Sequence, residues 1–117
     1  VTAEDDHIAP WKQCYRIRKY VNVNAPVRFV LSTSGHILGI VSPPVDPPKR
    51  AYWIGEPERN EHWEHWHERA EKRPGTWWQD WTAWLGERTG ELVDAYPVSN
   101  RKFPALADAP GTYVLEK

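Results

Sequence analysis

The stretch Val27-Arg28-Phe29-Val30-Leu31-Ser32-Thr33-Ser34-Gly35-His36 joins a short apolar run to a polar turn that ends in a histidine. Its first five residues are rich in β-branched and aromatic side chains, which is typical of a largely buried strand. Residues 32–35 have the composition of a turn. The sequence therefore predicts a strand over residues 27–31 with His36 in the loop that follows it.

An acidic loop and a helix are predicted before this strand. Residues 1–10 are polar and are expected to form a loop that contains Asp6. Residues 11–20 place apolar side chains three and four positions apart, which predicts a helix. In a parallel α/β sheet the loops at the carboxyl ends of the strands meet at one rim. Asp6 and His36 are therefore expected to lie close together.

The order acid, helix, strand, turn, histidine is that of the last two members of the triad in α/β-hydrolase folds. Such a histidine acts as a base near neutral pH, and the acid fixes its tautomer. The pattern also allows plainer interpretations. Asp6 could cap the helix that begins near Trp11, and His36 could be an ordinary loop histidine.

The chain is rich in proline and tryptophan, with 11 Pro and 8 Trp in the whole sequence. Four prolines at residues 43–48 predict an extended linker. Helices are predicted over residues 59–72 and 77–88, each with tryptophans on one face. In the second helix, Trp77, Trp81 and Trp84 are expected to form a buried stripe. The proline-rich tail to residue 117 is expected to be extended and packed onto the domain.

Composition limits the class of protein. The chain has 117 residues and a formal net charge of -1, so its overall charge gives no reason to expect nucleic acid as a partner. No apolar run approaches the roughly 20 residues of a membrane span. A single cysteine fits a reducing compartment such as the cytoplasm. The sequence opens without a signal peptide. Because it lacks methionine, we expect it to be cut from a longer protein.

Five segments, in order, resemble the polyhydroxyalkanoate synthases. Residues 6–11 are similar to that family's Asp-His-Ile-x-Pro-Trp motif, and residues 34–37 to its Ser-Gly-His-Ile segment. The other three are residues 49–53 (Lys-Arg-Ala-Tyr-Trp), the tryptophan-rich residues 76–85, and the Ala-Pro-Gly-x-Tyr-Val of residues 109–114. The resemblance runs from about residue 5 to residue 117.

The resemblance implies an α/β fold in which residues 1–117 form the C-terminal portion of an α/β-hydrolase-type catalytic domain. It implies an acyltransferase that joins (R)-3-hydroxyacyl units from coenzyme A thioesters into a growing polyester. Asp6 and His36 match the family's catalytic acid and base, and His7 either lines the substrate site or only packs in the loop. No cofactor is implied, because coenzyme A belongs to the substrate. The implied location is the cytoplasm or the surface of polyester granules, and the implied partners are the N-terminal remainder of the enzyme and, optionally, a second copy.

The sequence departs from the family pattern at two informative places. The nucleophile elbow Gly-x-Cys-x-Gly is absent, and Cys14 lies within the predicted helix without flanking glycines, so the isolated chain is expected to be inactive. Ser42 stands where the family commonly has asparagine before a Pro-Pro pair.

Two other functions remain open from the sequence. One is a fragment of a related esterase or depolymerase, and the other is a non-catalytic, tryptophan-rich binding module. Two further groups of residues have weaker interpretations. His62, His65 and His67 lack the spacing of a zinc motif, and no metal is expected. Lys49 and Arg50 fit a surface linker better than a site for coenzyme A phosphates.

Overall fold

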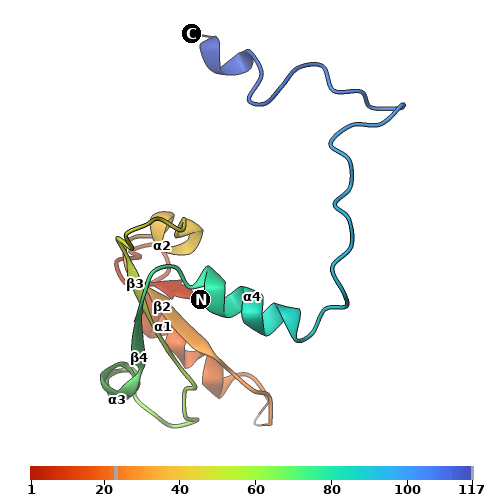
Figure 1. Cartoon of the computed structure of the whole chain (residues 1–117). Coiled ribbons are helices and arrows are strands. Elements are labelled where there is room, and N and C mark those ends of the chain that lie inside the picture. Colours follow the sequence, from red (N-terminus) through yellow and green to blue (C-terminus); the bar gives the residue numbers. More distant parts are fainter. Residues whose placement is uncertain (23, 117) are drawn as a thin grey trace.

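A four-stranded mixed sheet forms the centre of the chain, in a computed structural model that describes residues 1–22 and 24–116 (Figure 1). The strands are β1 (Thr2–Ala3), β2 (Phe29–Ser32), β3 (Ala51–Gly55) and β4 (Glu71–Pro74), and they lie side by side in that order. β1 and β2 are parallel, whereas β2–β3 and β3–β4 are antiparallel. The chain therefore has a mixed α/β architecture, with one parallel pair at the edge that contains β1.

The described residues also form six short helical segments. They are α1 (Trp11–Cys14), the 3₁₀ segment η1 (Tyr15–Lys19), α2 (Leu38–Val41), α3 (Trp63–Arg69), α4 (Trp78–Gly86) and η2 (Tyr113–Leu115). α1 and η1 follow one another directly, which confirms the helix predicted over residues 11–20 and adds that its second half is a tighter 3₁₀ turn. Within the described residues, no helix is long and apolar enough to cross a membrane.

Of the four strands, only β2 was predicted from the sequence; β1, β3 and β4 were not. Residues 1–10 were predicted to be loop, yet Thr2 and Ala3 pair with Leu31 and Ser32. Two residues are too few to show a period, so only the neighbouring strand defines β1. The helix predicted over residues 59–72 is also too long, because α3 ends at Arg69 and residues 71–74 form β4 along the edge of β3. Glu, Lys and Arg are good helix formers, but intrinsic propensity is a weak determinant, and the hydrogen bonds offered by β3 override it.

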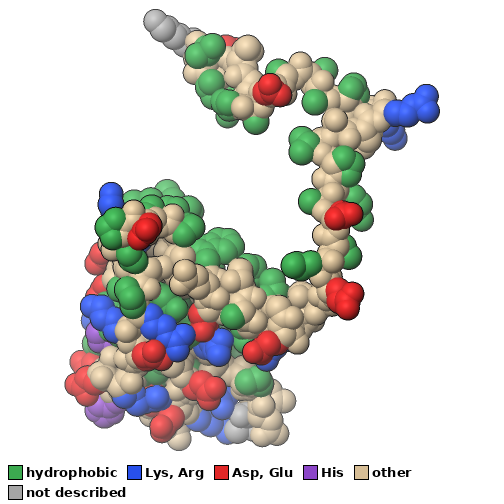
Figure 2. Space-filling view, in the orientation of Figure 1, with side chains coloured by type: hydrophobic (Ala, Val, Ile, Leu, Met, Phe, Trp, Pro, Cys, Tyr) green, Lys and Arg blue, Asp and Glu red, His purple; other side chains and the backbone are tan. Residues whose placement is uncertain are grey.

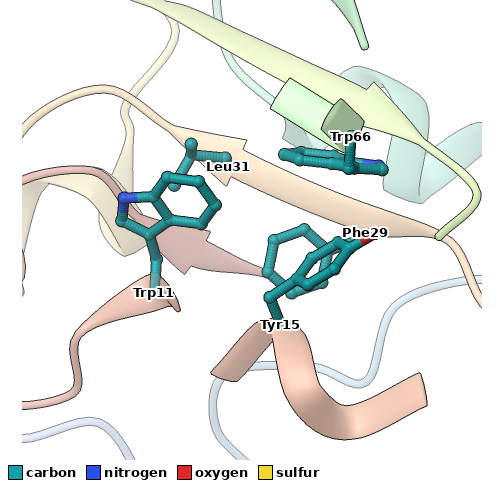
Figure 3. Packing of buried hydrophobic residues seen from close by; sticks show 5 residues of the cluster. All are labelled: Trp11, Tyr15, Phe29, Leu31 and Trp66. Atoms are coloured by element: carbon teal, nitrogen blue, oxygen red, sulfur yellow. The ribbon is translucent and has the colours of Figure 1, made fainter. Parts of the chain in front are cut away.

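Aromatic side chains fill the space on one face of the sheet. Trp66 is fully buried, and its ring lies 5.0 Å from that of Phe29, edge to face, and 5.6 Å from that of Tyr15. Figure 3 shows Trp11, Tyr15, Phe29, Leu31 and Trp66 converging between β2 and the surrounding helices. Alternate residues of a strand point to opposite faces. Val30 therefore faces the other way and packs with Tyr52, Ile54 and Trp77 in a second cluster.

The tryptophans of α4 do not form the buried stripe predicted from their spacing. Trp77 is buried, but Trp81 and Trp84 are each 39% exposed. Their side chains line an open groove of about 490 Å³, together with those of Ile17 and Val27. Polar contacts fix this helix instead, since Asp80 lies 2.9 Å from Arg28 and 3.3 Å from Arg73. The helical period places these side chains on one face but does not supply a layer to cover it.

The tail does not pack onto the domain, and that prediction is wrong. After α4 the chain runs away from the sheet to end in η2, apart from the rest of the molecule (Figure 1). Apolar side chains such as Leu92, Tyr96 and Val98 are fully exposed along it. Figure 2 shows hydrophobic side chains spaced along the extended segment. The interior space beside Trp66 is already filled by α1 and η1. The tryptophans therefore stabilise the sheet and its helices rather than the tail.

Candidate active site

The parallel pairing of β1 and β2 brings two loops to the same edge of the sheet. Beyond the strands, the amide of Glu4 donates to the carbonyl oxygen of Ser32 across 2.8 Å, and that of Asp5 donates to Ser34 across 3.1 Å. These bonds continue the pairing of the two chain segments beyond the strands. The pairing reaches as far as the residue before Asp6 in the first segment and the turn before His36 in the second. The carboxyl-end convergence predicted from the sequence is therefore present.

Asp6 and His36 are in direct contact. Oδ2 of Asp6 lies 2.8 Å from Nδ1 of His36, which confirms the predicted proximity. Oδ1 accepts hydrogen bonds from the amides of Ile8 and Ala9, each 2.9 Å long. The helix-cap interpretation is wrong, because α1 begins at Trp11 without any side-chain cap. Asp6 thus orders its own loop with one oxygen and holds His36 with the other.

The environment of Asp6 keeps its carboxylate charged. Its amide hydrogen bond from Ala9, and next its bond with His36, lower the pKa of Asp6 from 3.8 to about 2. A carboxylate accepts hydrogen bonds only, so Nδ1 of His36 must be the nitrogen that carries the proton. In the neutral ring Nε2 then keeps its lone pair. The His36 side chain is 45% exposed, and among the described residues Nε2 has no hydrogen-bond partner.

Backbone geometry around His36 is fixed by close packing. Ser34 in the preceding turn has a positive φ of 84°, a conformation that few non-glycine residues adopt. Gly39, in α2, lies so close to β1 that an added Cβ would sit 2.4 Å from the Cβ of Ala3. His36 therefore lies between the strained backbone of Ser34 and the helix α2. This helix packs against β1, the strand that precedes Asp6.

Two tryptophans of the α4 region hold α2 through hydrogen bonds to its backbone. The indole of Trp77 donates to the carbonyl oxygen of Gly39 across 3.2 Å, and that of Trp78 donates to Val41 across 3.0 Å. Sequence reasoning assigned the tryptophans to the core and missed this role. The signal that could have shown it is the polar indole N–H, which seeks an acceptor when it is buried.

Ser42 ends α2 in the left-handed conformation, with φ of 34°. It is almost fully buried, and its hydroxyl has no hydrogen-bond partner in the part of the chain that the structure describes. Left-handed backbone is tolerated best by glycine and asparagine. The asparagine of the family pattern therefore suits this position, and serine occupies it here at some conformational cost.

The other residues considered from the sequence lie outside this contact. His7 is exposed, and the structure gives its side chain no hydrogen bond to Asp6 or His36 within the described residues. Cys14 lies on α1, with Sγ 3.7 Å from the carbonyl oxygen of Ala9. His67 packs its ring 4.9 Å from that of Trp53, and no group of three metal-ligating side chains occurs among the described residues. Lys49 is exposed on the proline-rich linker.

Comparison with known proteins agrees with the motif resemblance. The chain is 38% identical, over all of its 117 residues, to poly(3-hydroxyalkanoate) polymerase subunit PhaC of Rhizobium etli. It is 42% identical over 97% of its length to poly(3-hydroxyalkanoate) polymerase 1 of Ectopseudomonas oleovorans, and 37% identical over 98% to the subunit of Cupriavidus necator. The chain matches the carboxyl-terminal part of poly(3-hydroxyalkanoate) polymerases.

The matches cover nearly all of this chain but only a small part of each polymerase. The chain spans 18–20% of the length of the relatives that it matches. No family model matches it. The contact between Asp6 and His36 thus occurs in a segment with continuous similarity to these polymerases.

Proposed function

We propose that this chain supplies the acid–base pair of a poly(3-hydroxyalkanoate) polymerase within an α/β-hydrolase-type catalytic domain. The observation that carries the proposal is the 2.8 Å contact between Asp6 and His36 at the carboxyl ends of parallel strands. The substrate would be an (R)-3-hydroxyacyl thioester of coenzyme A, and the product a polyester extended by one unit. The names and the extent of the matched relatives support this choice.

His36 would act through Nε2. It removes the proton of a cysteine thiol, and the thiolate attacks the thioester carbonyl carbon. The bond from that carbon to coenzyme A breaks, and the coenzyme A thiolate takes the proton back from His36. In the elongation step, His36 takes the proton of the 3-hydroxyl group that attacks the enzyme-bound acyl carbon. The bond from that carbon to the cysteine sulfur breaks, and the cysteine thiolate takes the proton back from His36. Asp6 would hold the productive tautomer and stabilise the imidazolium form.

The nucleophile would come from another part of the polymerase. The chain has one cysteine, Cys14, which lies in α1 without the flanking glycines of an elbow. The isolated chain would then be inactive, because a base without its nucleophile forms no acyl-enzyme. We place the complete enzyme in the cytoplasm or at the surface of polyester granules, as a monomer or a homodimer, without a cofactor.

Replacing His36 in the full polymerase tests this proposal. His36→Ala is expected to lower coenzyme A release from 3-hydroxybutyryl-coenzyme A by about 10⁴-fold, as the loss of a triad member typically does. Asp6→Asn should cost less if Asp6 only orients His36. His65→Ala removes an exposed imidazole from α3 and serves as the matched control. A folded His36→Ala enzyme that keeps more than about a tenth of the rate excludes the assigned role.

A related esterase or depolymerase is distinguished by its product. A hydrolase transfers the acyl group to water and releases free 3-hydroxy acid, whereas the polymerase extends a polyester. Chromatography of the product after complete coenzyme A release separates the two outcomes. Initial rates of coenzyme A release by His7→Ala at several substrate concentrations test whether His7 contacts the substrate, since only then should the Michaelis constant rise.

Partial exposure of the α4 tryptophans favours one second function, a binding surface. Trp78, Trp81 and Trp84 are each 39% exposed. Aromatic rings exposed together can stack on a carbohydrate or a polymer. Co-sedimentation of the chain with insoluble poly(3-hydroxybutyrate) or cellulose tests this function. Equal pelleting of the parent chain and the Trp81→Ala/Trp84→Ala variant would exclude it.

A further inference from the structure

A basic hollow lies between the α1–η1 helix and the segment that precedes α3. It has a volume of about 360 Å³, within the range of small-ligand pockets. Five cationic side chains line it: Lys12, Arg16, Arg18, Lys19 and Arg59. The concentration is unusual in a chain whose net charge is -1. No acidic residue occurs in the sequence between Asp6 and Asp46, so nothing on the helix itself offsets these charges.

The helical spacing gathers the cations on one side. Lys12, Arg16 and Lys19 are four and three residues apart, which places them on one face of a helix. In the described part of the chain, Lys12, Arg16, Lys19 and Arg59 form no ion pair. Lys12 lies 4.1 Å from the centre of the Trp63 ring, which sets its ammonium group at the wall of the hollow.

Two acidic side chains also line the hollow, and one of them is neutralised. Both oxygens of Glu61 are bound by Arg69, at 2.5 and 2.7 Å, and one also accepts the hydroxyl of Tyr15. These bonds lower the pKa of Glu61 to about 2, with the Arg69 bond as the largest cause, so the pair is permanent near neutral pH. Glu58 is the remaining acid. Five cationic side chains therefore line the hollow, against Glu58 as the acid that Arg69 does not neutralise.

This hollow is separate from the Asp6–His36 contact. Tyr15, which lines it, packs 5.2 Å from the ring of Phe29 at the start of β2. Asp6 and His36 lie beyond the other end of the same strand, past Ser32. A ligand in the hollow would consequently not need to be the reacting group of the proposed reaction.

We propose that this hollow binds a small phosphorylated anion with at least two negative charges. Arginine matches phosphate oxygens with paired N–H donors, and lysine adds a mobile charge beside them. The limited volume of the hollow, about 360 Å³, favours a small molecule over a long polyanion. The phosphate groups could belong to inorganic pyrophosphate or to a nucleoside diphosphate. The ring of Trp63 also lines the hollow and offers an aromatic surface beside them. The proposal does not rest on the polymerase function.

Calorimetric titration of the chain with pyrophosphate and with ADP tests the site, at about 50 mM salt to limit screening. We expect one site per chain. The variant Arg16→Gln/Lys19→Gln should bind at least about tenfold more weakly, since it removes two of the phosphate contacts. The control Arg101→Gln/Lys102→Gln removes the same charge from the exposed tail and should bind within about twofold of the parent chain. Circular dichroism checks that both variants fold.

Each outcome decides the proposal. Similar affinity for pyrophosphate and ADP would assign the site to the phosphates alone, and tighter binding of ADP would assign it to a nucleotide; both support it. Equal weakening in the two double variants would overturn it, because binding would then follow overall charge. Binding of heparin without pyrophosphate or ADP would overturn it in favour of a polyanion surface, and the absence of any binding would also overturn it. None of these results depends on polymerase activity.

Discussion

The indole nitrogen of Trp77 lies 3.2 Å from the carbonyl oxygen of Gly39 and donates a buried hydrogen bond to it. The two residues belong to segments 38 positions apart in the chain. Gly39 follows His36 by three residues, and α2 in turn touches β1, from which the chain leads to Asp6. The bond therefore ties the α4 region to the segment that presents His36.

Replacing this indole should weaken the fold. Trp77→Phe keeps an aromatic ring but leaves the carbonyl oxygen of Gly39 without its donor, so we expect a loss of about 2 kcal/mol in the free energy of unfolding. Urea denaturation followed by circular dichroism measures it. Trp81→Phe on the same helix, 39% exposed, should lose less than about 0.5 kcal/mol. Equal losses in the two variants would mean that the hydrogen bond contributes nothing.

A methyl group at Gly39 should disturb the acid–base pair. Gly39→Ala places a Cβ 2.4 Å from that of Ala3, so α2 and β1 must separate, at a cost of about 1–3 kcal/mol. Gly86→Ala in α4 meets no atom within 4 Å and should be neutral or stabilising by about 0.5 kcal/mol. Thermal unfolding of both variants checks the contrast. An unchanged midpoint for Gly39→Ala would show that the two segments are not in close contact.

Acid should remove the contribution of Asp6 to stability. The pKa of Asp6 falls from 3.8 to about 2 on folding, chiefly through the Ala9 amide and then through His36. The stabilisation is therefore complete above about pH 4 and is lost as the pH falls through about 2. We expect the difference in melting temperature between the parent chain and Asp6→Asn to shrink over that window. Asp5→Asn, at an exposed neighbouring acid, is the control, and a pH-independent difference would contradict the assignment.

The two groups of tryptophans should differ in their contribution to stability. Trp66 is fully buried among three aromatic rings, so Trp66→Ala should cost about 3–5 kcal/mol. Trp81 is 39% exposed, and Trp81→Ala should cost about 1 kcal/mol. Guanidinium denaturation measures both. A larger loss for Trp81 than for Trp66 would show that the groove beside α4 is filled in solution.

Local sequence patterns predicted some elements well and others badly. The helix at residues 11–20 and the strand near residues 27–31 were recovered because each has a clear period or an uninterrupted apolar run. β4 was missed because its charged residues fit a helix as well as an edge strand. The buried stripe in α4 was wrong because periodicity identifies a face and not what covers it. The tail was wrong for the same reason, since its apolar residues find no layer to join.

The sequence by itself determined which residues could form the site. Its motifs selected Asp6 and His36, and the order of loop, helix and strand implied that their segments end at one edge of a sheet. Only the tertiary structure decided how they are held. The pairing of Thr2 with Leu31, the contact of Gly39 with Ala3 and the hydrogen bond from Trp77 join residues far apart in the chain. Such contacts leave no local period in the sequence, because their geometry exists only once the segments have packed together.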